Sequence, residues 1–172
     1  MVTTVTHDID ACAQKIRVLV LDIDGVLTDG RLIFLPGGGE ARTFHVRDGL
    51  GTQLLVAAGI PVAAISGRAS DTVTRRAAEI GISPLFQGVD DKVKAFEQVL
   101  KQFDTTEDAV AYIGDDLPDL PLIERAGLGM AVADAALELR QKARHVLRAA
   151  GGQGAVREAC ELILRAKGKW IV

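Results

Sequence analysis

The sequence predicts an α/β fold: a Rossmann-like parallel sheet with helices on both faces, a β-hairpin insertion after the first strand, and no cap domain. Three observations favour this fold class. Short apolar runs rich in β-branched residues alternate with longer segments of helical character. The first run, Val18–Leu21, is apolar throughout, as in strands that are buried on both faces of a parallel sheet. Repeated strand–helix units of this kind are typical of parallel sheets with helices on both sides.

The chain has 172 residues, the length of about one domain, and we expect a single domain over residues 1–172. Its formal charge of −3 reflects 20 basic and 23 acidic side chains. Without a basic excess, neither nucleic acid nor an anionic membrane is an expected partner. Cys12 and Cys160 lack metal-ligand and redox spacing, which is typical of free thiols in a reducing compartment. Because no signal peptide or membrane-spanning run is evident, we expect a cytoplasmic protein.

The first expected elements are a short helix or lead-in, a strand and a hairpin. The lead-in covers Thr3–Gln14, and the strand covers Arg17–Leu21. Two extended runs, Arg31–Leu35 and Ala41–Val46, flank the turn-forming segment Pro36–Gly39. Such a pair of runs predicts a β-hairpin insertion over about residues 31–46.

Helices and strands alternate over the rest of the chain, and glycine or proline marks several boundaries. Gly59 and Gly81 each stop a helical pattern, and Pro118 suits the first turn of a helix. The expected helices cover Asp48–Ala58, Ala69–Ile80, Asp91–Phe103, Pro118–Ala126, Ala135–Ala143 and Ala155–Lys167. The expected strands cover Pro61–Ile65, Pro84–Gln87, Ala109–Ile113, Leu128–Val132 and His145–Leu147.

Polar side chains follow four of the expected strands, at the edge where open parallel sheets bind ligands. They are the pair Asp22 and Asp24, then Ser66, then Lys92, and finally the pair Asp115 and Asp119. Each has an ordinary alternative. Ser66 could cap a helix, Lys92 could be a solvated surface charge, and Asp115 and Asp116 could cap the helix that starts at Pro118.

These residue types together are the ones that phosphoryl transfer requires. A carboxylate nucleophile that approaches a phosphate dianion is repelled unless a divalent cation neutralises the charge. A hydroxyl and an ammonium group can then hold the phosphate oxygens as charge redistributes. The recurrence of these types in one structural position favours a phosphate site over four unrelated ordinary roles.

In these motifs the chain resembles the haloacid dehalogenase superfamily of phosphatases. Within that superfamily it is most similar to the phosphatases of 3-deoxy-D-manno-octulosonate 8-phosphate, and the similarity covers nearly the whole chain. The motifs that carry it are Asp22–Gly30, Val46–Gly49, Ser66–Arg68, Lys92, Gly114–Asp119, Ala131–Ala135 and Gly151–Glu158.

The resemblance implies a Mg²⁺-dependent hydrolysis through an aspartyl phosphate. In that mechanism Asp22 is the nucleophile, and Asp24 is first the general acid and then the general base. Ser66 and Lys92 hold the phosphoryl oxygens. The implied Mg²⁺ ligands are Asp22, the backbone carbonyl of Asp24, and Asp115, with Asp116 or Asp119 behind them.

The resemblance also implies which residues bind the sugar acid. They are His45, Val46, Arg47, Asp48, Gly49, Gly67, Arg68 and Arg76. An arginine suits the carboxylate of such a sugar because the pairing can be bidentate. Two positions depart from the family: His45 stands where Asn is usual, and Gln53 where a basic residue is frequent. A different substrate such as N-acylneuraminate 9-phosphate therefore remains an alternative, as does a non-catalytic oligomerisation domain.

The short intervals between the motifs leave the site without a lid of its own. About 40 residues separate Asp24 from Ser66, room for a hairpin and a helix but not for a cap domain. In the resembling family the hairpins of four subunits form a barrel, which implies a homotetramer. The apolar residues Leu32, Ile33, Phe34, Leu35, Phe44 and Val46 predict that the hairpin is buried, against neighbours or against its own domain. The role of the tail Lys167–Val172, which ends in the apolar residues Trp170–Val172, stays open.

Overall fold

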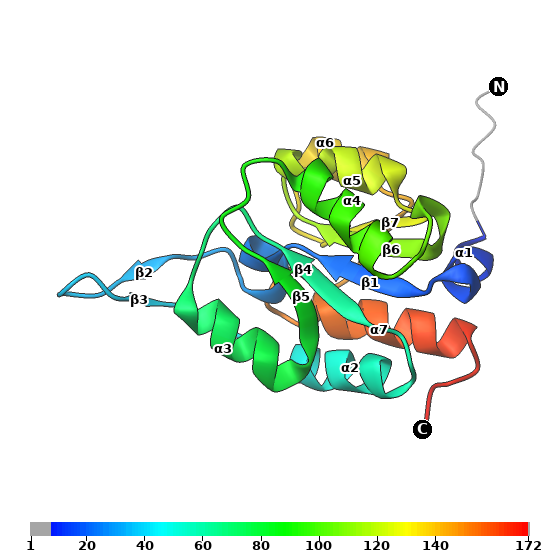
Figure 1. Ribbon diagram of the computed structural model, residues 1–172, viewed down its shortest axis with the longest axis horizontal. Coiled ribbons are helices and arrows are strands. Elements are labelled where there is room, and N and C mark those ends of the chain that lie inside the picture. Colours follow the sequence, from blue (N-terminus) through cyan, green and yellow to red (C-terminus); the bar gives the residue numbers. More distant parts are fainter. Residues whose placement is uncertain (1–7, 172) are drawn as a thin grey trace.

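The computed structural model describes residues 8–171 and confirms the predicted parallel sheet (Figure 1). Its strands lie in the order β5-β4-β1-β6-β7-β8, and every neighbouring pair is parallel. The strands are β1 Val18–Leu21, β4 Val62–Ile65, β5 Ile82–Phe86, β6 Val110–Gly114, β7 Leu128–Ala131 and β8 His145–Val146. The first part of the predicted lead-in Thr3–Gln14 lies outside the described residues, and so does Val172 of the predicted tail.

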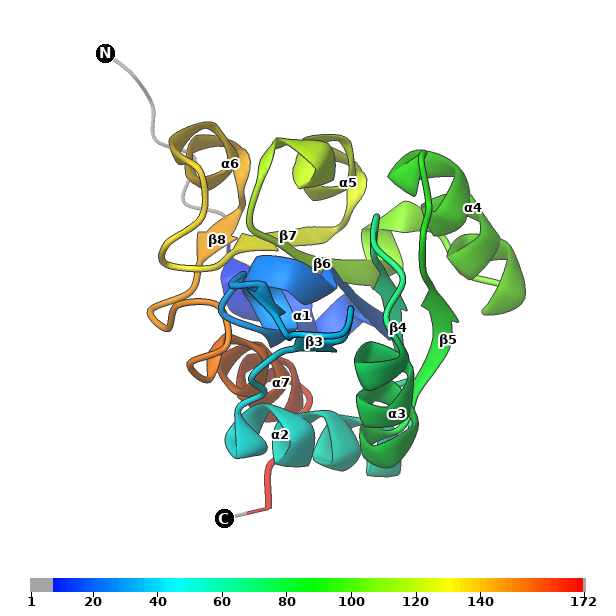
Figure 2. The same cartoon turned by 90° about the vertical axis from the view of Figure 1, so that its left-hand side faces the viewer.

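Helices cover both faces of the sheet, as Figures 1 and 2 show. On one face lie α2 Val46–Ala57, α3 Asp71–Ile80 and α7 Ala155–Ala166. On the other lie α4 Lys92–Gln102, α5 Leu120–Arg125 and α6 Leu137–Lys142. Helix α1, Ile9–Lys15, packs against α7, and short helical turns cover Ile23–Leu27, Glu107–Ala109 and Leu117–Asp119. No helix in residues 8–171 is both long enough and apolar enough to cross a membrane.

Strand β1 lies in the middle of the sheet and is buried along its whole length. It pairs with β4 on one side and with β6 on the other, so the chain changes direction around it. At such a switch point the loops that follow neighbouring strands diverge and leave a crevice at the carboxyl ends. Below the crevice, Phe96 and Tyr112 meet edge to face in the core, with ring centroids 6.3 Å apart. The fold therefore brings the loops after β1, β4 and β6 together.

The hairpin is shorter than the sequence predicted. Its strands are β2 Ile33–Phe34 and β3 Glu40–Ala41, and the second does not reach Val46. Val46 instead begins α2, because His45 caps that helix: its Nδ1 accepts a hydrogen bond of 3.2 Å from the N–H of Arg47. The hairpin projects from the body of the molecule (Figure 1).

The apolar side chains of the hairpin are not buried against their own domain. Phe34 is 72% exposed, and Ile33 and Leu35 are each 47% exposed. Phe44, at the base, is half-buried beneath the guanidinium of Arg76, which lies 5.9 Å from its ring centroid. Within residues 8–171 the tip of the hairpin is thus left exposed.

Several other helix and strand ends lie one or two residues from their predicted positions, as at the starts of α5 and α6. The starts of α3 and β5 are two further examples. Helix α3 begins at Asp71 rather than Ala69, because Ser70 is extended and its N–H donates to Gln87 Oε1 at 2.9 Å. Strand β5 covers Ile82–Phe86 and so begins two residues before Pro84, where the predicted strand started. Proline fits there because β5 is an edge strand, and an edge strand does not need every N–H for pairing.

Candidate active site

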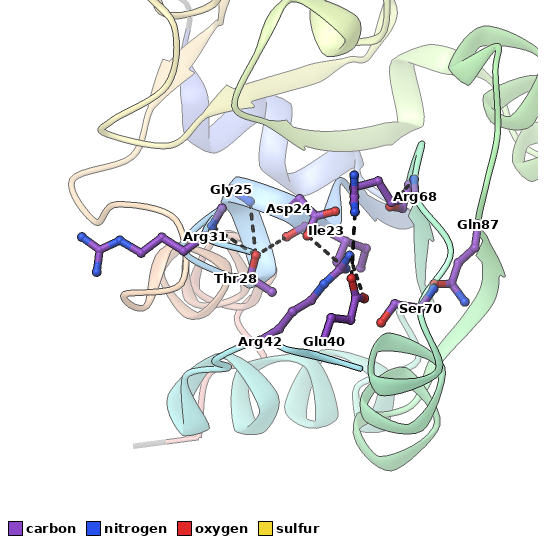
Figure 3. A network of polar contacts seen from close by, with 12 residues as sticks. Ile23, Asp24, Gly25, Thr28, Arg31, Glu40, Arg42, Arg68, Ser70 and Gln87 are labelled. Carbon is purple, nitrogen blue, oxygen red and sulfur yellow. Dashed lines mark hydrogen bonds and ion pairs between the residues drawn. The ribbon is translucent and has the colours of Figure 1, made fainter. Parts of the chain in front are cut away.

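The loop after β1 is folded by Thr28, which is fully buried. Its hydroxyl accepts hydrogen bonds from the N–H groups of Gly25, at 3.4 Å, and Gly30, at 3.2 Å (Figure 3). These bonds curl the chain directly after Asp22 and bring Asp24 back over the end of β1. Both acids therefore lie at the carboxyl end of the central strand, as the sequence predicted.

Glycines allow this loop to touch two other loops. Gly25 has φ +91°, and a Cβ there would lie 1.9 Å from Oδ2 of Asp115. A Cβ on Gly151 would lie 1.7 Å from the carbonyl oxygen of Gly25, and the N–H of Gly152 donates to Val26 O at 2.9 Å. The motif that begins at Gly151 is therefore a support for the Asp22 loop.

Lys92 joins the β1 loop to the β6 loop. Its Nζ donates to Asp22 Oδ1 at 2.5 Å and to Asp119 Oδ1 at 2.7 Å. The preceding Asp91 caps α4 by accepting hydrogen bonds from the N–H groups of Val93 and Lys94, which fixes Lys92 in the first turn. Burial lowers the pKa of Lys92, but Asp22 and Asp119 more than compensate and raise it overall. The alternative of a solvated surface charge is wrong.

Asp119 is the most enclosed acid of the cluster, at 1% exposed. Besides Lys92 it accepts hydrogen bonds from the hydroxyl of Tyr112, at 2.6 Å, and from the N–H of Asp115, at 3.1 Å. Asp116, by contrast, is exposed and accepts from the N–H of Leu117 at 2.8 Å, so it caps the next turn. Of the two acids expected behind the metal ligands, Asp119 is the one that joins the cluster.

The acidic cluster fits a divalent cation. Asp22, Asp115 and Asp119 each offer a carboxylate oxygen, and these oxygens lie within 4.8 Å of one another. Burial, and then the charge of Asp119, raise the pKa of Asp22 to about 8 and that of Asp115 to about 7. Carboxylates held this close repel each other, and Mg²⁺ prefers such oxygen ligands. The side chain of Asp24 is not in this cluster, so it could contribute only the backbone carbonyl that was predicted.

Asp24 instead faces a second group of charges at the base of the hairpin (Figure 3). Arg42 Nη1 lies 3.0 Å from Asp24 Oδ1, and Arg42 Nη2 lies 3.2 Å from Glu40 Oε1. Arg68 Nη2 lies 3.9 Å from Glu40 Oε2. Burial raises the pKa of Asp24; Arg42 and Arg68 counteract this, but the pKa stays above its ordinary value.

Sequence reasoning missed Glu40, Arg42 and Tyr112. Glu40 and Arg42 stand two positions apart on an extended segment, so their side chains share a face. That alternation of an acid and a base was the available signal. For Tyr112 there was none, because a tyrosine in an apolar strand is most simply a core residue.

A pocket of about 470 Å³ opens between these groups. Its lining residues are Asp22, Asp24, Ser66, Gly67, Arg68, Val89, Asp90, Lys92, Asp115, Asp116, Pro118 and Asp119. Ser66 is buried beneath it, and its Oγ accepts from the N–H of Arg68 at 3.2 Å, so it does not cap α3. The pocket thus combines a carboxylate nucleophile, an acid, a hydroxyl and an ammonium group around one space.

Six predicted substrate residues do not line this pocket: His45, Val46, Arg47, Asp48, Gly49 and Arg76. Asp48 is fully buried, and its Oδ1 accepts from the N–H of Arg157 at 2.8 Å. Arg76 pairs with Glu79 at 3.1 Å, and Gln53 bonds to the carbonyl of Glu79. Val46 and Arg47 are exposed. Their role in substrate binding stays a prediction.

Comparison with known proteins agrees with this geometry. Residues 80–158 match the model of a haloacid dehalogenase-like hydrolase family. The chain is 46% identical over 165 residues to the 3-deoxy-D-manno-octulosonate 8-phosphate phosphatase KdsC of Escherichia coli (strain K12), covering 96% of this chain and 88% of that protein. It is 46% identical over 157 residues to KdsC of Salmonella typhi, covering 91% and 84%.

The chain is also similar to solved structures of such phosphatases. The 3-deoxy-D-manno-octulosonate 8-phosphate phosphatase from Yersinia pestis superposes with a TM-score of 0.93 at 44% identity, covering 95% of this chain and 88% of that one. The corresponding phosphatase from Moraxella catarrhalis, solved with a magnesium ion, a phosphate ion and a KDO molecule, gives 0.91 at 44% identity, covering 93% and 92%. The chain therefore belongs to the haloacid dehalogenase-like hydrolases, in the family of the 3-deoxy-D-manno-octulosonate 8-phosphate phosphatases.

Proposed function

We propose that this chain is a phosphoric monoester hydrolase that converts 3-deoxy-D-manno-octulosonate 8-phosphate to the free sugar acid and phosphate, in lipopolysaccharide precursor synthesis. The observation that carries the proposal is the contact of Lys92 with Asp22 and Asp119 inside a pocket that also holds Ser66 and Asp24. The identity to KdsC over 96% of the chain supports the substrate.

Each half of the reaction has a residue to perform it. An oxygen of Asp22 attacks phosphorus, the bond from phosphorus to the sugar oxygen breaks, and Asp24 gives its proton to that oxygen. In the second half Asp24 takes a proton from water as the water oxygen attacks phosphorus, which releases phosphate and restores Asp22. The raised pKa of Asp24 favours the first role, because it lowers the cost of holding a proton on this carboxyl.

The remaining groups of the pocket manage charge. Lys92 holds Asp22 in place and, with the Ser66 hydroxyl, can hold the phosphoryl oxygens. Asp22, Asp115 and Asp119, with the carbonyl of Asp24, would hold the Mg²⁺ cofactor. When bound, that cation supplies the positive charge that lets a carboxylate approach a phosphate.

Substrate recognition starts from Arg68, whose half-exposed side chain lies at the pocket beside Gly67. Its guanidinium can pair with the sugar carboxylate in a bidentate manner. The role of the six predicted residues outside the pocket stays a prediction. We also propose the homotetramer, supported by the exposed apolar hairpin.

Two broader proposals concern the chain as a whole. We propose that residues 1–172 form one catalytic domain, since β1 and the strands from β4 to β8 share a single sheet. We also propose that the protein acts in the cytoplasm. Its two cysteines are free thiols, as a reducing compartment favours.

The test is a phosphate-release assay on a panel of sugar acid phosphates, with Mg²⁺ and with a chelator. We expect the highest kcat/KM for 3-deoxy-D-manno-octulosonate 8-phosphate, no activity with the chelator, and a loss of several orders of magnitude in Asp22→Asn. A higher efficiency for N-acylneuraminate 9-phosphate would assign that substrate instead. No release from any substrate would favour the non-catalytic oligomerisation domain.

A further inference from the structure

Arg42 is a buried arginine on an otherwise exposed hairpin. Its side chain is 0% exposed, whereas that of Arg31, on the opposite side of the same hairpin, is 84% exposed. A buried guanidinium is costly unless charged partners compensate for the lost hydration. The position of Arg42 is therefore determined by its two partners, Asp24 and Glu40.

The local geometry explains how one side chain reaches both acids. Glu40 ends the paired part of the hairpin in β3, and Arg42 follows two positions later on the same face. The two terminal nitrogens of the guanidinium then separate the acids, with Nη1 on Asp24 and Nη2 on Glu40. Arg68 approaches Glu40 from the far side, so two arginines and two carboxylates alternate in a row (Figure 3).

This contact fixes which oxygen of Asp24 is available. Oδ1 is buried and faces Arg42, while the residue as a whole lines the pocket. Oδ2 is therefore the oxygen left to meet the leaving group. The contact of Oδ1 with Arg42 is an ion pair, and no aligned hydrogen bond reaches this oxygen from Arg42 or from any other described residue. Without the ion pair the carboxyl could therefore rotate.

Arg42 itself is not placed to touch a substrate. It is absent from the lining of the pocket, and its terminal nitrogens are closed off from solvent. Arg68, by contrast, lines the pocket and is half-exposed. The two arginines of the row thus have separate tasks, one toward the substrate and one toward Asp24.

We propose that Arg42 is a positioning residue for Asp24: it holds the carboxyl with Oδ2 toward the leaving-group oxygen, and Glu40 holds Arg42 in turn. The inference rests on the proposed general-acid role of Asp24. It makes the base of the hairpin part of the reaction machinery, although the hairpin supplies no residue to the pocket lining.

The experiment compares two leaving groups. A sugar alkoxide needs a proton as it leaves phosphorus. The p-nitrophenolate that leaves p-nitrophenyl phosphate is a stable anion and hardly needs one. In Arg42→Met we expect kcat for the sugar acid phosphate to fall about 10- to 100-fold with little change in KM, since small misplacements have effects of this size. The kcat for p-nitrophenyl phosphate should stay within about threefold. Arg42→Lys, which keeps a charge, should recover most of the loss.

Arg31→Met is the matched control, because it removes the same charge from the same hairpin at an exposed site. We expect it to leave kcat unchanged for both substrates. Equal losses on both substrates in a folded Arg42→Met protein, or no loss, would overturn the inference. If that variant melts below the assay temperature, Glu40→Gln carries the same test, and an unchanged ratio of the two kcat values would overturn it. Asp24→Asn tests the proposed function separately. If Asp24 is the general acid, this variant must change the ratio of the two kcat values whether or not Arg42 positions it.

Discussion

Gly25 shows how tightly single residues determine this site. It combines a positive φ with a backbone that touches Asp115, so two constraints meet at one position. Gly37 in the hairpin turn has nearly the same φ, +92°, but nothing lies within 4 Å of its missing Cβ. Comparing substitutions at Gly25 and Gly37 therefore separates the cost of backbone strain from the cost of displacing the carboxylate of Asp115.

We therefore predict different outcomes for Gly25→Ala and Gly37→Ala. Both should lose roughly 1–2 kcal/mol of unfolding free energy, because an alanine resists positive φ. Only Gly25→Ala should also lose Mg²⁺ binding and activity, since its methyl group displaces Asp115. Calorimetry of Mg²⁺ binding and a phosphate-release assay measure the difference. Full Mg²⁺ affinity in Gly25→Ala would show that Asp115 is not a ligand.

Tyr112 offers a second prediction for a single residue. Its fully buried hydroxyl donates to a carboxylate, and a bond to a charged group is worth about 1.5–3 kcal/mol. Tyr112→Phe should lower the unfolding free energy by about that amount in urea titrations. Thr52→Val, which removes a buried hydroxyl bond of 2.9 Å to the uncharged carbonyl of Asp48, should cost about 1 kcal/mol. A smaller loss for Tyr112→Phe than for Thr52→Val would contradict the role assigned to its bond with Asp119.

Residue types at the strand ends could be predicted from the sequence, but their partners could not. Asp22, Ser66, Lys92 and Asp115 follow apolar runs, so the pattern and the resemblance found them. Arg42 is different, because its partners depend on how the base of a hairpin with two-residue strands meets the loop after β1, and no periodicity encodes that contact.

At the scale of elements, Asp48 illustrates how a motif can serve the fold. It lies in the first turn of α2, is fully buried, and accepts from the N–H of Arg157 near the start of α7. Burial raises its pKa, although the backbone bond from Arg157 opposes the shift. The resemblance implied a substrate role, whereas the contact visible here joins two helices.

The hairpin is the element whose surroundings the single chain leaves open. Phe34→Asp should break the proposed tetramer without unfolding the subunit, because the side chain is 72% exposed. Sedimentation velocity measures the assembly, and kinetics on the sugar acid phosphate should show a lower kcat/KM. Phe44→Asp is a poorer test, since Phe44 is half-buried and lies beneath Arg76. An intact tetramer in Phe34→Asp would place the interface elsewhere.

For the whole molecule, the acidic cluster predicts a pH-dependent response to Mg²⁺. The pKa of Asp22 is about 8 and that of Asp115 about 7, both far above the value of about 4 in an unfolded chain. The folded protein without metal thus keeps protons that the unfolded chain has lost. Stability from these groups is complete below pH 4 and is lost as pH rises toward 8.

A bound cation should reverse that loss, because it replaces the protons. We expect the rise in Tm on adding Mg²⁺ to be small at pH 5 and to grow steadily up to about pH 8. Thermal melts with and without Mg²⁺ across this range measure it, and protein freed of divalent cations by a chelator is the reference. A Tm shift independent of pH would mean that the carboxyls are already ionised without the cation.

The sheet and its helices were largely predictable because β1 and its neighbours are buried on both faces, which leaves a plain apolar signature. Element ends were harder. The start of α3 depends on Gln87, which is distant in sequence, and the start of α2 depends on a histidine cap where Asp or Ser is usual. The predicted starts of these two helices were wrong because one depends on a side chain that is distant in sequence and the other on an unusual capping residue.

The chain after α7 returns to the end of the sheet opposite the pocket. Lys167 Nζ donates to the carbonyl of Gln14 at 2.6 Å, just before β1, and Lys169 Nζ donates to that of Ala58 at 2.7 Å, before β4. Figure 1 shows α1 and this segment together, with the hairpin at the far end. A subunit coupled to a solid support through residue 171 would therefore present its pocket outward, so an immobilised sensor that reports phosphate release could be built without blocking substrate entry.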